Sequence, residues 1–241
     1  EGAKAIAEYI KNNGAMTSLN VSNNKIGELV FVEDGWTRDT NGDYESWMYK
    51  NTDGRKQKEE PPKEPKGAIA LASAISTNGA LTSLNMSNNM LATKASGKAL
   101  AGMLSSNSVL KELDVSKNAQ YPSGSSWSDA DGPGFANELA VGISANGALT
   151  SLNLASNYLY AEGAKHVAEA IKVNVSALRF DWYHFQLDLT FGSTAVVYGY
   201  SYYTTPKGAL ASLDLSQNSM PAREMGPIER LCESKQIALR K

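Results

Sequence analysis

The residues that catalysis or metal binding would need are few in this sequence, and they are poorly spaced for either task. There are two histidines, His166 and His184, and one cysteine, Cys232. No group of Cys, His and acidic residues has the spacing of a zinc site, and no serine lies in the motif of an activated nucleophile. The paired acids Glu59 and Glu60 lie in a charged, proline-rich segment. The sequence therefore predicts a protein that is not an enzyme, with no cofactor and no metal.

Two short segments match ligand-binding loops only in part. Residues 132–137, GPGFAN, have no lysine of the kind that a phosphate-binding loop supplies. Residues 129–132, DADG, start like a calcium loop but have no later glutamate. We interpret both matches as chance.

Aromatic residues are the stronger functional candidates, because Trp and Tyr are enriched among the residues that hold a protein partner. They gather in three segments that differ in composition from the rest of the chain. The candidate partner-binding residues are Trp36, Trp47, Tyr49, Trp127, Trp182, Tyr183, Tyr200 and Tyr202. An alternative stays open, in which these rings cover the protein's own surface.

Around these segments the chain repeats an eleven-residue stretch, GALTSLNMSNN at residues 79–89, with close copies that begin at Gly14, Gly147 and Gly208. Leucine or another apolar residue recurs with the spacing L-x-x-L-x-L, and an Asn follows. Between the copies run one-sided apolar stripes at spacings of three and four, which predict amphipathic helices. Each repeat is thus expected to be one strand followed by one helix.

Several copies match in both halves, and this pattern resembles the long leucine-rich repeats of ribonuclease inhibitor and related eukaryotic intracellular proteins. The resemblance implies an α/β solenoid over residues 1–241, with a curved parallel sheet inside and helices outside. In such a stack the inward apolar residues fill the core. The repeated Asn can bond backbone groups at the end of each strand, and we expect Asn24, Asn89, Asn118 and Asn157 to form a ladder.

The first break in the repeat, residues 28–66, resembles a WW module. Asn-Gly and Asp-Gly pairs predict hairpin turns, and the runs between them predict a small three-stranded sheet. Trp36 and Pro61 have the spacing at which that family packs its first Trp on its closing Pro. The family's second Trp, which grips proline-rich peptides, would fall at Lys58. The insert is therefore a degenerate WW-like sheet, and its clamp is incomplete.

The other two breaks differ in kind. Residues 119–133 are rich in Ser, Gly, Asp and Pro, and we expect a loop. Residues 180–206 alternate apolar and polar side chains on both sides of a Gly-Ser-Thr turn, which predicts a β-hairpin.

Composition limits the cellular setting. The 241 residues carry a net charge of −2, and no apolar run is long enough to span a bilayer. This balance does not indicate a nucleic-acid partner. The single cysteine is typical of a reducing compartment, so we expect an intracellular, cytoplasmic protein. An organelle stays open, because the sequence starts without Met inside a helical half-repeat, as a truncated or processed chain would.

The sequence therefore predicts a scaffold or accessory subunit that binds protein partners within a larger complex and performs no catalysis. Two alternatives remain. One is an inhibitory or regulatory domain that occludes an enzyme or a nucleotide switch, and the other is a WW-like reader of proline-rich peptides. The outward strand positions, such as Ser83 and Asn85, are small and neutral, so we expect the binding energy in the inserts.

Overall fold

A computed structural model of the chain describes residues 1–31, 36–39, 46–50, 56–58, 63–119, 130–174, 186–189, 193–196, 210, 212–216, 218 and 222–241. Its main feature is a six-stranded parallel sheet of very short strands. In spatial order these are β1 (Ser18–Asn20), β7 (Ser83–Asn85), β8 (Glu112–Asp114), β9 (Ser151–Asn153), β12 (Ser212–Asp214) and β13 (Ala238–Arg240). Spatial order follows chain order, so each new strand is added at the same growing edge.

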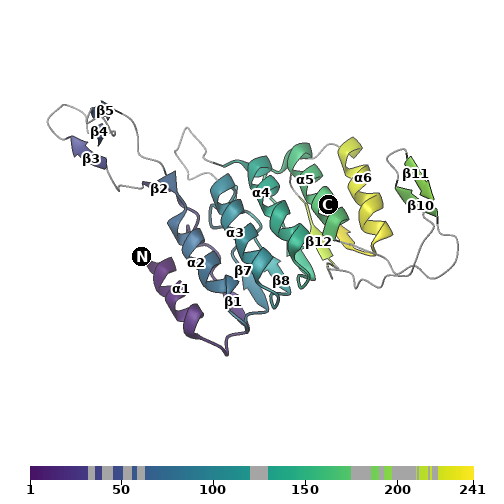
Figure 1. The fold of residues 1–241 in the computed structure, drawn as a ribbon, viewed down its shortest axis with the longest axis horizontal. Helices are drawn as coiled ribbons and strands as arrows, with labels where there is room; N and C mark the ends of the chain where they lie inside the picture. Colours follow the sequence, from purple (N-terminus) through teal and green to yellow (C-terminus); the bar gives the residue numbers. More distant parts are fainter. Residues whose placement is uncertain are drawn as a thin grey trace.

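One helix layer covers this sheet. The helices are α1 (Gly2–Asn12), α2 (Lys66–Ser76), α3 (Lys94–Ser106), α4 (Gly132–Ala145), α5 (Tyr160–Asn174) and α6 (Ala222–Ser234). They lie side by side in chain order, in front of the strands (Figure 1). The α/β class that the sequence predicts is confirmed, because strands and helices alternate along the chain and the sheet is parallel.

The core lies between the two layers and is built from the repeated apolar positions. The middle residue of each strand faces inward, and the sheet register aligns Leu84 with Leu19 on one side and with Leu113 on the other. Leu84 is 1% exposed. Burying one such leucine contributes about 1.5–3 kcal/mol. The helices add their own apolar stripes, in which Leu71, Leu100 and Phe135 have no exposed surface.

Three smaller sheets lie outside this stack. β2 (Val30–Phe31) pairs antiparallel with β6 (Lys63–Glu64). β3 (Trp36–Asp39), β4 (Ser46–Lys50) and β5 (Lys56–Lys58) form a three-stranded antiparallel sheet within the segment where the WW-like insert is predicted. β10 (Gln186–Leu189) and β11 (Ser193–Val196) form an antiparallel pair in the segment where a hairpin is predicted.

The three inserted segments leave the stack at two different edges. Residues 28–66 join β1 to α2, and residues 119–133 join β8 to α4, so both leave where a strand gives way to its helix. Residues 180–206 lie between α5 and β12, where a helix returns to the sheet. Residues 120–129 lie outside the described part of the chain, and 132–133 already belong to α4.

Candidate interaction surfaces

The repeated Asn side chains form a ladder inside the strand-to-helix edge. The backbone N–H of Asn89 donates to Oδ1 of Asn118 at 2.6 Å, and that of Asn118 donates to Oδ1 of Asn157 at 2.8 Å. The Nδ2 of Asn118 donates to the carbonyls of Val115 and Met86, one in its own repeat and one in the preceding repeat. The predicted ladder is confirmed, and it continues through Asn218.

A second Asn ladder lies at the opposite edge, where each helix ends, and the sequence analysis missed it. Asn107 ends α3 and donates its Nδ2 to the carbonyls of Ile75 and Asn78, both in the preceding repeat. Its Oδ1 accepts the backbone N–H groups of Val109 and Leu110. Asn13, Asn78 and Asn146 hold the same position. The signal in the sequence is an Asn three residues before the first apolar residue of four of the copies.

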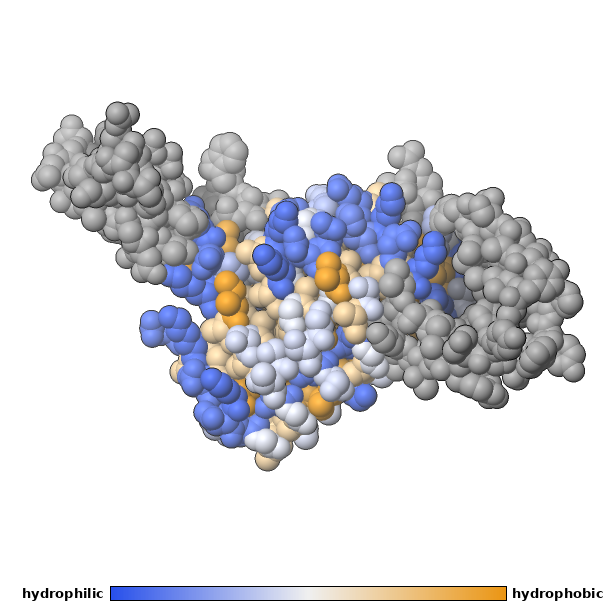
Figure 2. Space-filling model, in the orientation of Figure 1, coloured by the Kyte–Doolittle hydropathy of each residue, from blue (hydrophilic) through white to orange (hydrophobic). Residues whose placement is uncertain are grey.

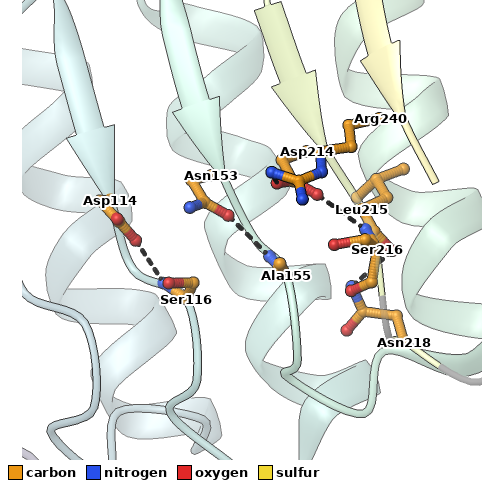
Figure 3. A network of polar contacts seen from close by, with 9 residues as sticks. All are labelled: Asp114, Ser116, Asn153, Ala155, Asp214, Leu215, Ser216, Asn218 and Arg240. Carbon is orange, nitrogen blue, oxygen red and sulfur yellow. Dashed lines mark hydrogen bonds and ion pairs between the residues drawn. The ribbon is translucent and has the colours of Figure 1, made fainter.

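The outward face of the sheet carries small polar side chains that are already bonded. In β1, β7, β8, β9 and β12, the side-chain oxygen of the last residue accepts the backbone N–H of the residue two positions later. Asn85, for example, accepts the N–H of Ser87 at 2.9 Å. Figure 3 shows the same bond from Asp114, Asn153 and Asp214 to Ser116, Ala155 and Ser216. These Asx turns end the strands. Local turn geometry therefore largely explains why Asn and Asp occupy the outward position at the end of each strand.

The charged residues at the outward strand positions are Glu112, Asp114, Asp214 and Arg240. Glu112 lies beside Ser83, whose Oγ donates to Oε2 of Glu112 at 2.9 Å. At the far end Arg240 pairs with Asp214 at 3.7 Å (Figure 3). An exposed ion pair of this kind contributes little to stability. In the six strands of the parallel sheet, all of them described, the outward positions hold no aromatic residue that could anchor a partner.

An exposed aromatic pair lies at the strand-to-helix edge, and the sequence analysis did not single it out. The rings of Tyr158 and Tyr160 stack with centroids 6.3 Å apart and planes 16° apart. The two residues are 39% and 49% exposed. They flank the buried Leu159 where the turn after β9 leads into α5, whose first residue is Tyr160. Two aromatic residues on either side of a core leucine, as in NYLY, are the signal that would have identified this pair.

Both tyrosines adopt the left-handed backbone region, with φ of 51° for Tyr158 and 52° for Tyr160. This region costs a residue with a side chain about 1–2 kcal/mol. Lys25 and Met90 hold the position of Tyr158 in other repeats and share its left-handed φ, whereas Ala119 at the same position does not, so this conformation recurs in most of these turns. Tyr160 is different, because Ala92 at its position has no such φ. Backbone strain of this kind clusters at functional sites.

The second insert ends against this aromatic pair. Gly132 is the first residue of α4, and a side chain there would collide with the carbonyl oxygens of Asn157 and Tyr158. The glycine allows the start of α4 to lie directly on the backbone of the tyrosine turn. The described end of this insert, at Gly132, therefore lies against the backbone of Tyr158.

The outer helix face is poor in charge at its centre. Figure 2 shows pale and orange atoms there, between blue patches. The exposed residues in the second halves of α2, α3 and α4 are small or apolar, and they include Ser73, Gly102, Ser105 and Val141. This is a smooth surface, without the Trp, Tyr or Arg that usually anchors a partner.

The predicted partner-binding residues fall into two groups. Trp36 lies in β3, and Trp47 and Tyr49 lie in β4, where the register places Trp36 opposite Tyr49 and Trp47 opposite Arg38. The others lie outside the described residues, namely Trp127, Trp182, Tyr183, Tyr200 and Tyr202.

Among the described residues, the side chains that could react or bind a metal form no cluster. His166 is half-buried on α5, and burial raises the pKa of the Cys232 thiol in α6. Among the described residues, no three His, Cys, Asp or Glu side chains come close enough to hold a metal ion. No helix in that part of the chain is both long enough and apolar enough to cross a membrane.

Comparison of the sequence with models of known protein families finds no match, and comparison with curated proteins finds none either.

Proposed function

We propose that this chain is a leucine-rich-repeat solenoid of the ribonuclease-inhibitor-like type that binds protein partners without catalysis, as a scaffold or accessory subunit. Three features support the proposal. Successive strands add in chain order with one register, as in Leu19, Leu84 and Leu113. Each repeat contacts its neighbours through the two Asn ladders. The inward positions hold the apolar residues of the repeat. This is nearest-neighbour stacking of one strand–helix unit on the next.

The observation that carries a binding role is the exposed Tyr158–Tyr160 stack at the strand-to-helix edge. Tyrosine offers a large contact area at little conformational cost, which is why it is frequent at protein interfaces. The two inserts with Trp36, Trp47 and Trp127 leave the stack from this same edge. We infer that the edge, more than the outward strand face, holds the partner.

Substitution of the tyrosine pair tests this proposal. Tyr158→Asn and Tyr160→Asn remove both rings, and Asn tolerates the left-handed backbone at these positions. We expect the double variant to keep its thermal midpoint within a few degrees and to lose co-purifying chains at least tenfold. The measurement is quantitative mass spectrometry after purification from the native source at low salt.

Two matched controls make the result specific. Tyr9→Asn removes an exposed tyrosine from α1, the N-terminal helix of the stack, and should leave the co-purifying chains unchanged. Asn85→Ala with Asn153→Ala alters the outward strand face. If only this last variant loses its partner, the binding site lies on the sheet and the edge proposal is wrong.

A second candidate function is a reader of proline-rich peptides by the WW-like insert. The three-stranded antiparallel β3–β4–β5 sheet favours it, with Lys58 opposite Met48 in the register. Recognition of such peptides needs an aromatic groove, and Lys58 stands where the family's second Trp would lie. Lys58→Trp should therefore create or strengthen binding of a proline-rich peptide, measured by fluorescence anisotropy. Equal binding by the unmodified chain would favour the reader function directly.

A further inference from the structure

Two Asn–Gly pairs lie inside the second Asn ladder. They are Asn78–Gly79, after α2, and Asn146–Gly147, after α4. The two asparagines are 7% and 3% exposed, whereas both glycines are exposed. An asparagine is chemically most labile when glycine follows it, because no side chain hinders attack of the glycine nitrogen on the amide carbon. The ladder therefore buries its most reactive asparagines.

Packing does not explain why glycine follows Asn78. A Cβ on Gly79 would meet no atom within 4 Å, and the φ of Gly79 lies outside the left-handed region. In the next repeat Ser108 holds the same position after Asn107, which makes the same four side-chain bonds. Neither space nor backbone conformation requires glycine at residue 79, so its distinguishing property is the reactivity that it gives to the asparagine.

Four hydrogen bonds hold this amide in the folded chain. Nδ2 of Asn78 donates to the carbonyls of Ile10 and Asn13, at 2.9 Å each. Its Oδ1 accepts the backbone N–H of Ala80 at 2.9 Å and that of Leu81 at 2.8 Å. The amide at residue 146 makes the same four bonds, to Leu104, Asn107, Ala148 and Leu149. Because Nδ2 is bonded to the preceding repeat, its release requires that two neighbouring repeats separate.

We propose that Asn78 and Asn146 are modification sites that deamidate only when neighbouring repeats separate, and that the product permanently weakens their stacking. The backbone nitrogen of the glycine attacks Cγ of the asparagine, so that an N–Cγ bond forms and the Cγ–Nδ2 bond breaks. Nδ2 leaves as ammonia with the proton of the glycine N–H. Water then opens the succinimide ring at one of its two carbonyls and leaves aspartate or isoaspartate. This inference does not depend on any partner of the chain.

Neither product fits the ladder. In aspartate an oxygen replaces Nδ2, and an ionised carboxylate has no hydrogen to donate to the carbonyls of Ile10 and Asn13. Burial of such a charge without a partner is costly. In isoaspartate the main chain runs through Cγ and is one carbon longer, which displaces the N–H groups that bond Oδ1 in the folded chain. Separated repeats are therefore favoured after the reaction.

The first experiment compares the full 241-residue chain in the folded state and in urea, both at pH 8. Peptide mass spectrometry follows the conversion of each asparagine. We expect conversion of Asn78 and Asn146 to be at least a hundredfold slower in the folded chain, because the ladder must open first. Asn107 is the internal control, since Ser108 follows it, and should convert at least tenfold more slowly than Asn78 in urea. Equal rates for Asn78 in the two states overturn the proposal.

The second experiment measures what the product does. Chains are kept in urea until both asparagines have converted, refolded by dilution, and unfolded again in urea. We expect a lower urea midpoint than that of freshly refolded chain. Gly79→Ser with Gly147→Ser copies the natural pair Asn107–Ser108, and this variant should keep its midpoint through the same incubation. The variant retains the other two Asn–Gly pairs of the sequence, so their conversion is common to both samples.

A second variant carries the aspartate product from the start. Asn78→Asp with Asn146→Asp should lower the urea midpoint at pH 8 without any incubation. The proposal is overturned if this variant has the midpoint of the unmodified chain, or if converted chain refolds with an unchanged midpoint. It is also overturned if the serine variant loses stability during incubation as much as the unmodified chain does.

Discussion

The backbone N–H of Asn89 donates to the side-chain oxygen of Asn118 at 2.6 Å, across the boundary between two repeats. The same side chain donates back to the carbonyl of Met86 in the repeat of Asn89. One amide thus closes its own turn and binds the neighbouring one, with both residues almost fully buried. Since buried backbone groups need partners, this pair links local turn geometry to the stacking of the whole sheet.

Replacing Asn118 should therefore be costly. Asn118→Ala leaves the N–H of Asn89 and the carbonyl of Val115 buried without that partner, and we expect a loss of about 3 kcal/mol in the free energy of unfolding. Asn24→Ala is the matched control, because Asn24 belongs to the same ladder at its exposed end, and should cost about 1 kcal/mol or less. Urea unfolding followed by circular dichroism measures both. Equal losses would contradict the role assigned to burial.

The second ladder gives a pH-dependent prediction. In Asn107→Asp, one carboxylate oxygen faces the carbonyls of Ile75 and Asn78 in a buried site. Burial and these carbonyls raise the pKa of the new carboxyl in the folded state above its unfolded value of about 3.9. Stability relative to the unmodified protein is then lost as pH rises through that range.

We expect Asn107→Asp to be more destabilising at pH 7 than at pH 4, by about 1–3 kcal/mol. The exposed Asn137→Asp in α4 is the control, and its effect should change little between the two pH values. Urea unfolding of both variants and of the unmodified protein, at pH 4 and at pH 7, measures these differences in the free energy of unfolding. A destabilisation that is independent of pH would mean that the introduced carboxyl is not buried in the folded state.

Two glycines in adjacent helices should respond in opposite directions to alanine. A Cβ on Gly142 in α4 would lie 2.6 Å from the Cα of Ala101 in α3, so Gly142→Ala must push the helices apart, at a cost of about 1–3 kcal/mol. Gly102, the neighbour of Ala101, has nothing within 4 Å of such a Cβ. Gly102→Ala should stabilise by about 0.5–1 kcal/mol through the unfolded chain. The thermal midpoints of the two variants measure these changes in stability. If both midpoints move in the same direction, the close contact between the helices is refuted.

The single cysteine should be inert in the folded protein. Cys232 is buried, and burial raises the pKa of its thiol. Because the thiolate is the reactive form, we expect reaction with a thiol-reactive disulfide reagent at pH 8 to be at least a hundredfold slower than in urea. The raised pKa stabilises the fold below the thiol's ordinary pKa, and that contribution is lost as pH rises above it. Fast reaction without denaturant would show that α6 opens locally.

Sequence pattern anticipated the features that repeat. The spacing of Leu81, Leu84 and Met86 predicts a strand with inward side chains, and the structure buries all three. Periodicity suffices here because each repeat meets a copy of itself, so the environment of one position is the same in every unit. The ladder through Asn89 and Asn118 followed from the same reasoning.

Some features were missed. Nothing in the local pattern marks the final strand β13 or the stacked Tyr158 and Tyr160, because a three-residue strand and a two-residue aromatic contact carry too little periodic signal. The second Asn ladder was visible in the spacing, but its bonds join Asn107 to a helix end in another repeat. Such a contact is defined only when the helices are placed side by side.

The amino-acid sequence by itself determined which residues of the repeats face the core, where the repeated strands and helices lie, and which Asn closes the turn after each repeated strand, because these depend on spacing within one repeat. Tertiary structure alone decided which insert leaves at which edge, and that Gly132 lies on the turn of Tyr158. These relations join residues from different repeats. They follow from the stacking of whole units, which no single repeat encodes.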